Sequence, residues 1–161
     1  MPKIVSLSAD QLFALTEECV KKGQSVRVTV KGNSMSPFLR SEVDSVELAA
    51  ADFNTLNQGD IVLIRRTTGE YILHRVFEKK NNYFSILGDA QTIPEGPIYK
   101  EQLLAKVISI WRGDVSIQCS SFVWQTVGIL WINALTFRKI IWRFRRICGY
   151  FFLKFTLPFD R

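Results

Sequence analysis

Short segments of alternating apolar and polar residues dominate the first two thirds of the chain. In the segment VRVTV, residues 26–30, three valines alternate with Arg27 and Thr29, a period typical of a strand with one buried face. Similar segments follow, separated by turn signals such as Gly-Asp and Asn-Asn. They predict strands at 43–49, 60–66, 71–78, 83–87, 104–112 and 115–118. Many short strands at near-regular spacing predict a mainly β body, either a barrel or a sandwich.

Helical patterns occur only near the two ends of the chain. Ser8 and Gln11 match a capping box, and the apolar positions after them keep helical spacing until Gly23. We therefore predict a short N-terminal helix over about residues 8–22. At the other end, from Ser121, the strand pattern gives way to the 16-residue run FVWQTVGILWINALTF. This run predicts an apolar helical tail.

The charge distribution divides the chain at the same place. The net charge is +6, yet residues 1–120 carry 14 basic and 14 acidic side chains. Residues 121–161 carry seven basic side chains and one acidic one, together with 11 of the 20 aromatic residues. The composition indicates a neutral body, residues 1–120, and a basic aromatic tail, residues 121–161.

The tail has the composition of a segment that contacts lipid. Its apolar run is shorter than the about 20 residues that span a bilayer. Tryptophan, phenylalanine and clustered arginine are typical of a helix lying at the membrane interface. We expect residues 121–157 to contact membrane lipid; a helical hairpin packed on the body or on a partner is the alternative. Nucleic acid is not an expected partner, because the charges are embedded among long apolar residues.

The sequence gives no indication of a metal or cofactor. Cys19, Cys119 and Cys148 lack the spacing of metal ligands, and His74 is the only histidine. We therefore expect no zinc site, no disulfide framework and no cofactor. The N-terminus has no basic start leading into a long apolar run, so no secretory signal peptide is predicted.

Two residues are candidates for chemistry. Ser34 lies in the turn KGNSMSPFLR after the first predicted strand, and His74 lies in the strand segment YILHRVF. The period of two places His74 on one face with Ile72 and Val76, and an imidazole on an apolar face needs either a partner or a purpose. A serine hydroxyl becomes a nucleophile only when a positioned base removes its proton. Taken alone, His74 is either a structural histidine or such a base.

Four fragments in order favour the base. They are GNSMSPFL, GDIVLI, LHRV and LGDA, with 40 residues between Ser34 and His74. This series resembles the serine peptidase superfamily of type I signal peptidases and LexA-like self-cleaving repressors, over roughly residues 26–112. The resemblance implies a signal peptidase/LexA-like β-barrel body and a serine endopeptidase that cleaves a leader or signal segment.

The resemblance also implies roles for individual residues. Ser34 matches the nucleophile, and His74 stands where bacterial signal peptidases and LexA carry a lysine base, as in the archaeal and endoplasmic-reticulum enzymes. Asp89 of the second Gly-Asp box is the first candidate for the acid that supports His74, and Glu95 is the second. The Ser34 N–H is expected in the oxyanion hole. Gly32 occupies the position of a second donor and cannot serve, so it is expected to allow a positive φ or a close approach of substrate.

The substrate is less well defined than the fold. The family implies a peptide bound in extended conformation along a sheet edge. The chain most resembles compact bacterial members, which implies a location at the cytoplasmic membrane, on a side that the sequence leaves open. A peptide-binding module on the same fold, without catalysis, is the alternative function.

Overall fold

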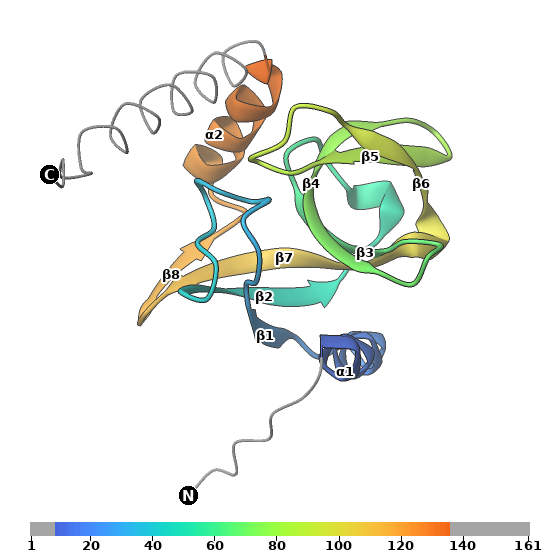
Figure 1. Ribbon diagram of the computed structural model, residues 1–161, viewed down its shortest axis with the longest axis vertical. Helices are drawn as coiled ribbons and strands as arrows, with labels where there is room; N and C mark the ends of the chain where they lie inside the picture. The colour runs from blue at the N-terminus through green and yellow to red at the C-terminus, as the bar shows by residue number, and fades with distance from the viewer. Residues whose placement is uncertain (1–8, 136–161) are drawn as a thin grey trace, which may run out of the picture.

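The computed structural model describes residues 9–135 (Figure 1). Eight strands lie between two α-helices, and two short 3₁₀ helices connect strands. The elements are α1 (Ala9–Lys21), β1 (Val26–Thr29), β2 (Asp44–Ala50), η1 (Phe53–Thr55), β3 (Ile61–Arg65), β4 (Tyr71–Lys79), β5 (Tyr83–Leu87), β6 (Glu95–Tyr99), η2 (Lys100–Gln102), β7 (Leu103–Arg112), β8 (Val115–Gln118) and α2 (Phe122–Asn133). The predicted tail beyond residue 135 lies outside the described residues.

The strands form one antiparallel sheet that is curled but open. Their order is β1-β2-β7-β3-β4-β5-β6, and β8 pairs with β7 beside β3. The ladders contain register shifts, for example between Glu47 and Leu48 and between Val76 and Glu78, and such bulges bend a sheet. The mainly β prediction is confirmed. The predicted β-barrel does not close, because the end strands β1 and β6 do not pair with each other.

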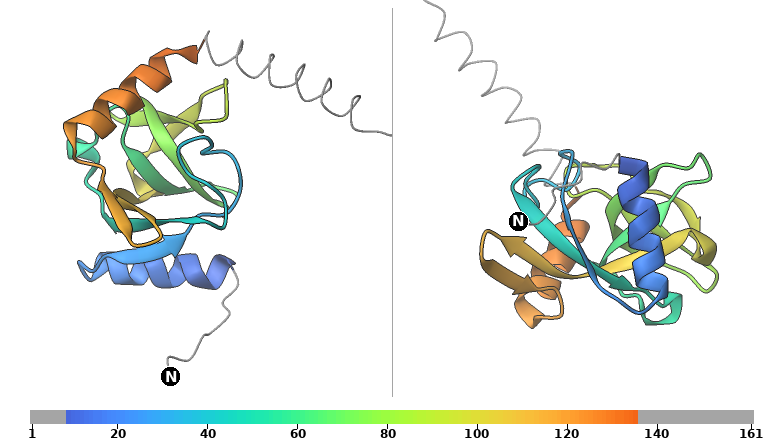
Figure 2. Two further views of the ribbon diagram at one scale, coloured as in Figure 1. Left: turned by 90° about the vertical axis from the view of Figure 1, so that its left-hand side faces the viewer. Right: turned by 90° about the horizontal axis from the view of Figure 1, so that it is seen from below.

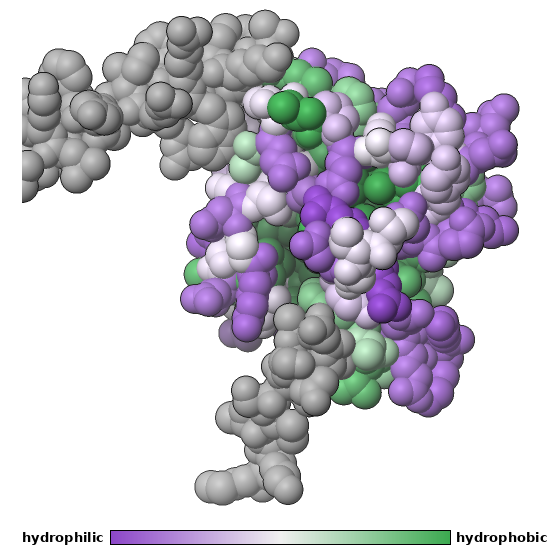
Figure 3. All heavy atoms as spheres, turned by 45° about the vertical axis from the view of Figure 1, so that its right-hand side comes forward, coloured by the Kyte–Doolittle hydropathy of each residue, from purple (hydrophilic) through white to green (hydrophobic). Residues whose placement is uncertain are grey.

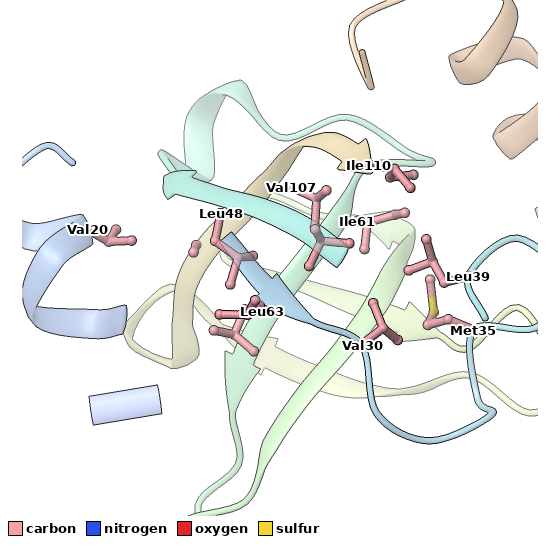
Figure 4. Packing of buried hydrophobic residues seen from close by; sticks show 12 residues of the cluster. Val20, Val30, Met35, Leu39, Leu48, Ile61, Leu63, Val107 and Ile110 are labelled. Carbon is pink, nitrogen blue, oxygen red and sulfur yellow. The ribbon is translucent and has the colours of Figure 1, made fainter. Parts of the chain in front are cut away.

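The curled sheet encloses two hydrophobic clusters, one on each face of β3. Ile61 and Leu63 point into the first cluster, while Val62 and Ile64 point into the second. Burial on both faces explains why this strand reads as a continuous apolar run instead of an alternating one. The first cluster (Figure 4) contains Val20, Val28, Val30, Met35, Leu39, Val46, Leu48, Ile61, Leu63, Ala105, Val107 and Ile110. The second contains Phe53, Leu56, Val62, Ile64, Val76, Phe84, Ile86 and Ile98.

The two helices lie at opposite ends of the sheet (Figure 2). Helix α1 lies beside β1 and β2, where Val20 enters the first cluster and Phe13 stacks on Tyr71 with ring centroids 4.6 Å apart. Helix α2 lies at the far end, next to the turn that joins β1 to β2. No helix within residues 9–135 is long and apolar enough to cross a membrane.

One strand, β6, was not predicted from the sequence. Strand β6 contains Gly96 and Pro97, which disfavour regular strands, but β6 lies at the sheet edge, where a residue without an N–H is tolerated. A Cβ on Gly96 would lie 3.0 Å from the Cβ of Ser85 on β5. The glycine therefore permits close pairing of the two strands. The other strands and the N-terminal helix are confirmed, with bounds that differ by no more than one residue at either end.

Phe84 tests the second cluster. Its side chain is fully buried, so Phe84→Ala should lower the free energy of unfolding by about 3–5 kcal/mol. Tyr83→Ala, at the neighbouring position where the side chain is 39% exposed, should cost about 1 kcal/mol or less. Urea unfolding of both variants measures the difference, and equal losses would contradict the assignment of this core.

Candidate active site

The turn that carries Ser34 is anchored on both sides of the serine. Gly32 has a φ of +87° and donates its N–H to the Ser41 hydroxyl at 3.0 Å. This positive φ agrees with one of the two roles expected for the glycine. Met35 and Leu39 are buried in the first cluster, and the Leu39 N–H donates to the Met35 carbonyl at 2.9 Å. Ser34 itself stays half-buried at the surface of this anchored turn.

A second turn, residues 88–91, holds the main chain of Ser34. The Ala90 N–H donates to the Ser34 carbonyl at 2.8 Å. A Cβ on Gly88 would lie only 2.7 Å from the same carbonyl oxygen, so this approach requires glycine. Arg75 of β4 stands opposite Leu87, the residue before this turn. The turn therefore holds Ser34 at the end of the β4–β5 ladder, next to the segment of β4 that carries Arg75 and His74.

His74 is a buried imidazole. The side chain is 3% exposed, and its Nδ1 has no hydrogen-bond partner among the described residues. Its predicted neighbours on this face are Ile72 and Val76. Val76 belongs to the second cluster, and Ile72 packs against it. Burial lowers the pKa of His74 to about 4; nearby Glu95 opposes this shift and the Arg66 guanidinium adds to it. The ring is therefore neutral at neutral pH, as a general base must be.

Asp89, the first candidate for the supporting acid, is engaged elsewhere. The Arg75 Nε–H and Nη2–H donate to its two carboxylate oxygens at 2.9 and 2.8 Å. Both side chains are almost fully buried. Since neighbouring strand residues point to opposite faces, the Arg75–Asp89 pair lies on the face of β4 away from the imidazole of His74. The structure brings Asp89 to Arg75, a residue that was not predicted to take part in the site although it lies in the LHRV fragment.

Glu95, the second candidate, lies at the start of β6 within electrostatic reach of His74. Its carboxylate accepts hydrogen bonds from Nε–H and Nη2–H of Arg66, the first of them 2.5 Å long. Arg66 also donates to Glu70 at 2.7 Å. The Arg66 hydrogen bonds lower the pKa of Glu95 against the effect of burial, and the charge of His74 contributes a smaller lowering. Arg66 was not predicted, because its contact with Glu95 joins residues 29 positions apart.

Other polar residues near these turns have structural roles. Asp60 of the first Gly-Asp box accepts from the Asn57 N–H and from Lys106 Nζ, each at 2.8 Å, and so closes a turn. Burial raises the pKa of the Cys119 thiol to about 11, which keeps it protonated. Within residues 9–135 no three histidine, cysteine or acidic side chains gather as they would around a metal ion.

Comparison with known families shows the family of the chain. The model of the family described as Peptidase S24-like matches residues 1–108. The chain belongs to the Peptidase S24-like family. Membership places it with the LexA and signal peptidase-like proteins and indicates a serine peptidase type of function, although some S24-like proteins are not catalytic. No curated protein sequence matches the chain.

The S24-like match includes Ser34, His74, Asp89 and Glu95 but ends before α2. This helix lies directly on the Ser34 turn: Trp124 and Trp131 contact the Phe38 ring edge-on, with centroids 5.8 and 5.3 Å from it. The Trp131 Nε1–H also donates to the Asp89 carbonyl at 3.0 Å. The tail predicted from the sequence therefore begins with a helix that covers one side of the candidate site.

The single histidine allows a direct test of its environment. In an NMR titration the ring protons of His74 should report a pKa of about 4, well below the ordinary 6.5. Arg66→Gln should raise this pKa, because it removes a positive charge, and Glu95→Gln should lower it. Since the unfolded chain then binds a proton first, the free energy of unfolding should fall as the pH drops from about 6.5 towards 4. A midpoint near 6.5 would contradict burial of the ring.

Stability measurements separate the two acids. Asp89→Ala leaves Arg75 buried without its partner, and it should lower the free energy of unfolding by about 3–5 kcal/mol. Glu95→Ala removes a partner from an ion pair that is about one third exposed, so it should cost about 1 kcal/mol or less. Denaturant unfolding of both variants at pH 7 checks the difference. A larger loss for Glu95→Ala would reverse the assignment of the structural pair.

Proposed function

We propose that the protein is a serine endopeptidase in which Ser34 is the nucleophile, His74 the general base and Glu95 the supporting acid. The observation that carries the proposal is the neutral, buried ring of His74, which lies on β4 beside the last pair of the β4–β5 ladder, where the turn after β5 holds Ser34. The unpartnered Nδ1 supports it further, since a purely structural buried imidazole usually satisfies its polar atoms.

The proposed reaction is acyl transfer. Ser34 Oγ attacks the carbonyl carbon of the scissile peptide bond while His74 takes the hydroxyl proton. The Ser34 N–H donates to the oxygen that becomes negatively charged. His74 then passes its proton to the leaving amine, and water hydrolyses the acyl-enzyme in a second cycle of the same steps. Glu95 stabilises the imidazolium formed in each cycle, because its negative charge favours the protonated ring.

Glu95 is preferred to Asp89 because of charge. Both oxygens of Asp89 are occupied by Arg75, and the charges that act on His74 are those of Glu95 and Arg66. Arg66 weakens the support from Glu95 by neutralising part of its charge. This arrangement keeps the resting ring unprotonated and leaves a carboxylate nearby when the proton arrives.

Two open strand edges support binding of an extended peptide. Within the described residues β1 pairs only with β2, and residues Tyr71–His74 of β4 pair with β3 but have no ladder partner on the β5 side. Both strands run towards the candidate site, β1 to Ser34 and β4 to His74. A substrate strand that adds to such an edge gains main-chain hydrogen bonds and delivers its scissile bond to the serine. From the resemblance, the proposed substrate is a leader or signal segment of a protein or peptide.

A non-catalytic peptide-binding module is the second candidate. It is favoured by the binding of Glu95 to Arg66 instead of to the Nδ1 of His74. The same open edges would hold the peptide in that case, and the chain would present it without cutting.

The proposed site of action is a membrane surface, the cytoplasmic membrane of a bacterial cell, which residues 121–157 contact. The part of this segment that the structure describes, α2, exposes several large apolar side chains, as interfacial helices do.

The decisive experiment is mass spectrometry of leader-type peptides incubated in lipid with the protein and its variants. Ser34→Ala and His74→Ala should each slow cleavage by at least about a thousandfold. Glu95→Gln should reduce the rate by about 10²–10⁴-fold. Glu70→Gln is the matched control: it alters the other carboxylate bound to Arg66 and should cleave at the parent rate.

The outcomes distinguish the two functions. Cleavage that persists in Ser34→Ala or His74→Ala would exclude the proposed mechanism. Intact peptides that bind tightly to the parent protein would establish the binding module instead. Equal losses in Glu95→Gln and Glu70→Gln would show that Glu95 acts only through the Arg66 network.

A further inference from the structure

Helix α2 has two opposite faces of different character. Phe122, Val123 and Leu130 are 82%, 71% and 64% exposed, and at 100° per residue they fall on one side of the helix together with Val127. Large apolar side chains rarely gather on a free surface without a partner. In Figure 3, hydrophobic atoms lie exposed at the upper end of the molecule, where Figure 1 draws α2.

The charge pattern identifies the kind of partner. Residues 122–135 contain no charged side chain, whereas residues 136–161 of the same chain carry all seven basic residues of the tail and one acidic residue. An uncharged apolar face that leads directly into a basic aromatic sequence complements an anionic lipid surface, where apolar groups enter the acyl boundary and cations meet the headgroups. A second copy of the chain carries the same net charge of +6 and would therefore bring like net charge together.

The other face of α2 holds the nucleophile turn. Trp124 and Trp131 contact Phe38, which is four residues from Ser34 in the anchored turn. Trp131 also holds the Asp89 carbonyl, next to the residue whose N–H binds the Ser34 carbonyl. Both turns that fix Ser34 therefore contact the same side of one helix.

Gly128 permits the closest contact of this face with the sheet. A Cβ at that position would lie 2.8 Å from Arg75 Nη1, so the helix backbone rests directly on the guanidinium of the buried ion pair. Arg75, Phe38 and the turn of residues 88–91 therefore all contact α2 directly.

We propose that α2 couples lipid binding to the candidate active site: its Phe122, Val123 and Leu130 face binds an anionic lipid surface, and its Trp124, Gly128 and Trp131 face then holds the Ser34 turn in the reactive position. The coupling of lipid to turnover rests on the proposed peptidase function; the lipid-binding face does not. The function of α2 is thus to make peptide cleavage depend on contact with the membrane.

Vesicle flotation and hydrogen exchange test the two parts separately. The parent chain should bind phosphatidylcholine vesicles containing phosphatidylglycerol, and Phe122→Ser/Leu130→Ser should bind them at least about tenfold more weakly. Val115→Ser is the matched control, because Val115 on β8 is as exposed as Leu130, 64% in each case, yet lies outside the face. On vesicle binding, amides of residues 31–41 should exchange at least about threefold more slowly, and peptide turnover should rise.

Each possible result decides a part of the proposal. Unchanged vesicle binding by Phe122→Ser/Leu130→Ser would overturn the lipid face, as would a dimer in sedimentation that this variant abolishes. Normal binding without slower exchange in residues 31–41 would overturn the coupling. If binding and exchange behave as expected but no peptide is cleaved by the parent, the peptidase proposal fails while the lipid face and its contact with the turn stand.

Discussion

The buried ion pair between Arg75 and Asp89 is the interaction on which the arrangement of the site depends. The guanidinium joins β4 to the turn after β5 through Asp89 and to the turn before β3 through the Gly59 carbonyl, 2.9 Å from Nη1. It also lies 5.4 Å from the Phe38 ring and supports α2. A buried charge without a partner is strongly unfavourable. Moving any one of these segments away from Arg75 would therefore be costly. An arginine is required here, since a lysine lacks the planar fork that serves three acceptors.

Two adjacent residues of β4, His74 and Arg75, lie in different environments. Arg75 points to one face, where a carboxylate fully compensates its charge, and His74 points to the other, where no described residue bonds its Nδ1. A second arginine–carboxylate pair, Arg66 with Glu95, stands near His74 but is partly exposed. The first pair fixes geometry in a dry environment, whereas the second tunes the charge around a titratable ring. Two similar pairs thus have different consequences because their solvent exposure differs.

The sequence predicted what depends on local pattern and left out what depends on register. Alternation identified seven strands, but β6 was missed because Gly96 and Pro97 are acceptable only at an edge, and edges are not visible in a pattern. The sequence motifs identified Ser34 and His74 as candidate site residues. They did not indicate that Asp89 pairs with Arg75, because that contact follows from the β4–β5 ladder. The open sheet also could not be foreseen, since closure depends on how strongly the bulges bend the strands.

The open sheet has a consequence for the chain in solution. Unpaired strand edges that suit an extended peptide suit any exposed strand equally, including one from another copy. The chain limits this hazard at β1, which is only four residues long, carries Arg27 on its exposed side and has α1 lying beside it. The unpaired edge of β4, Tyr71–His74, is short as well, only four residues. Short edges of this kind offer few main-chain hydrogen bonds to a strand from another copy, so they limit strand addition between copies of the chain.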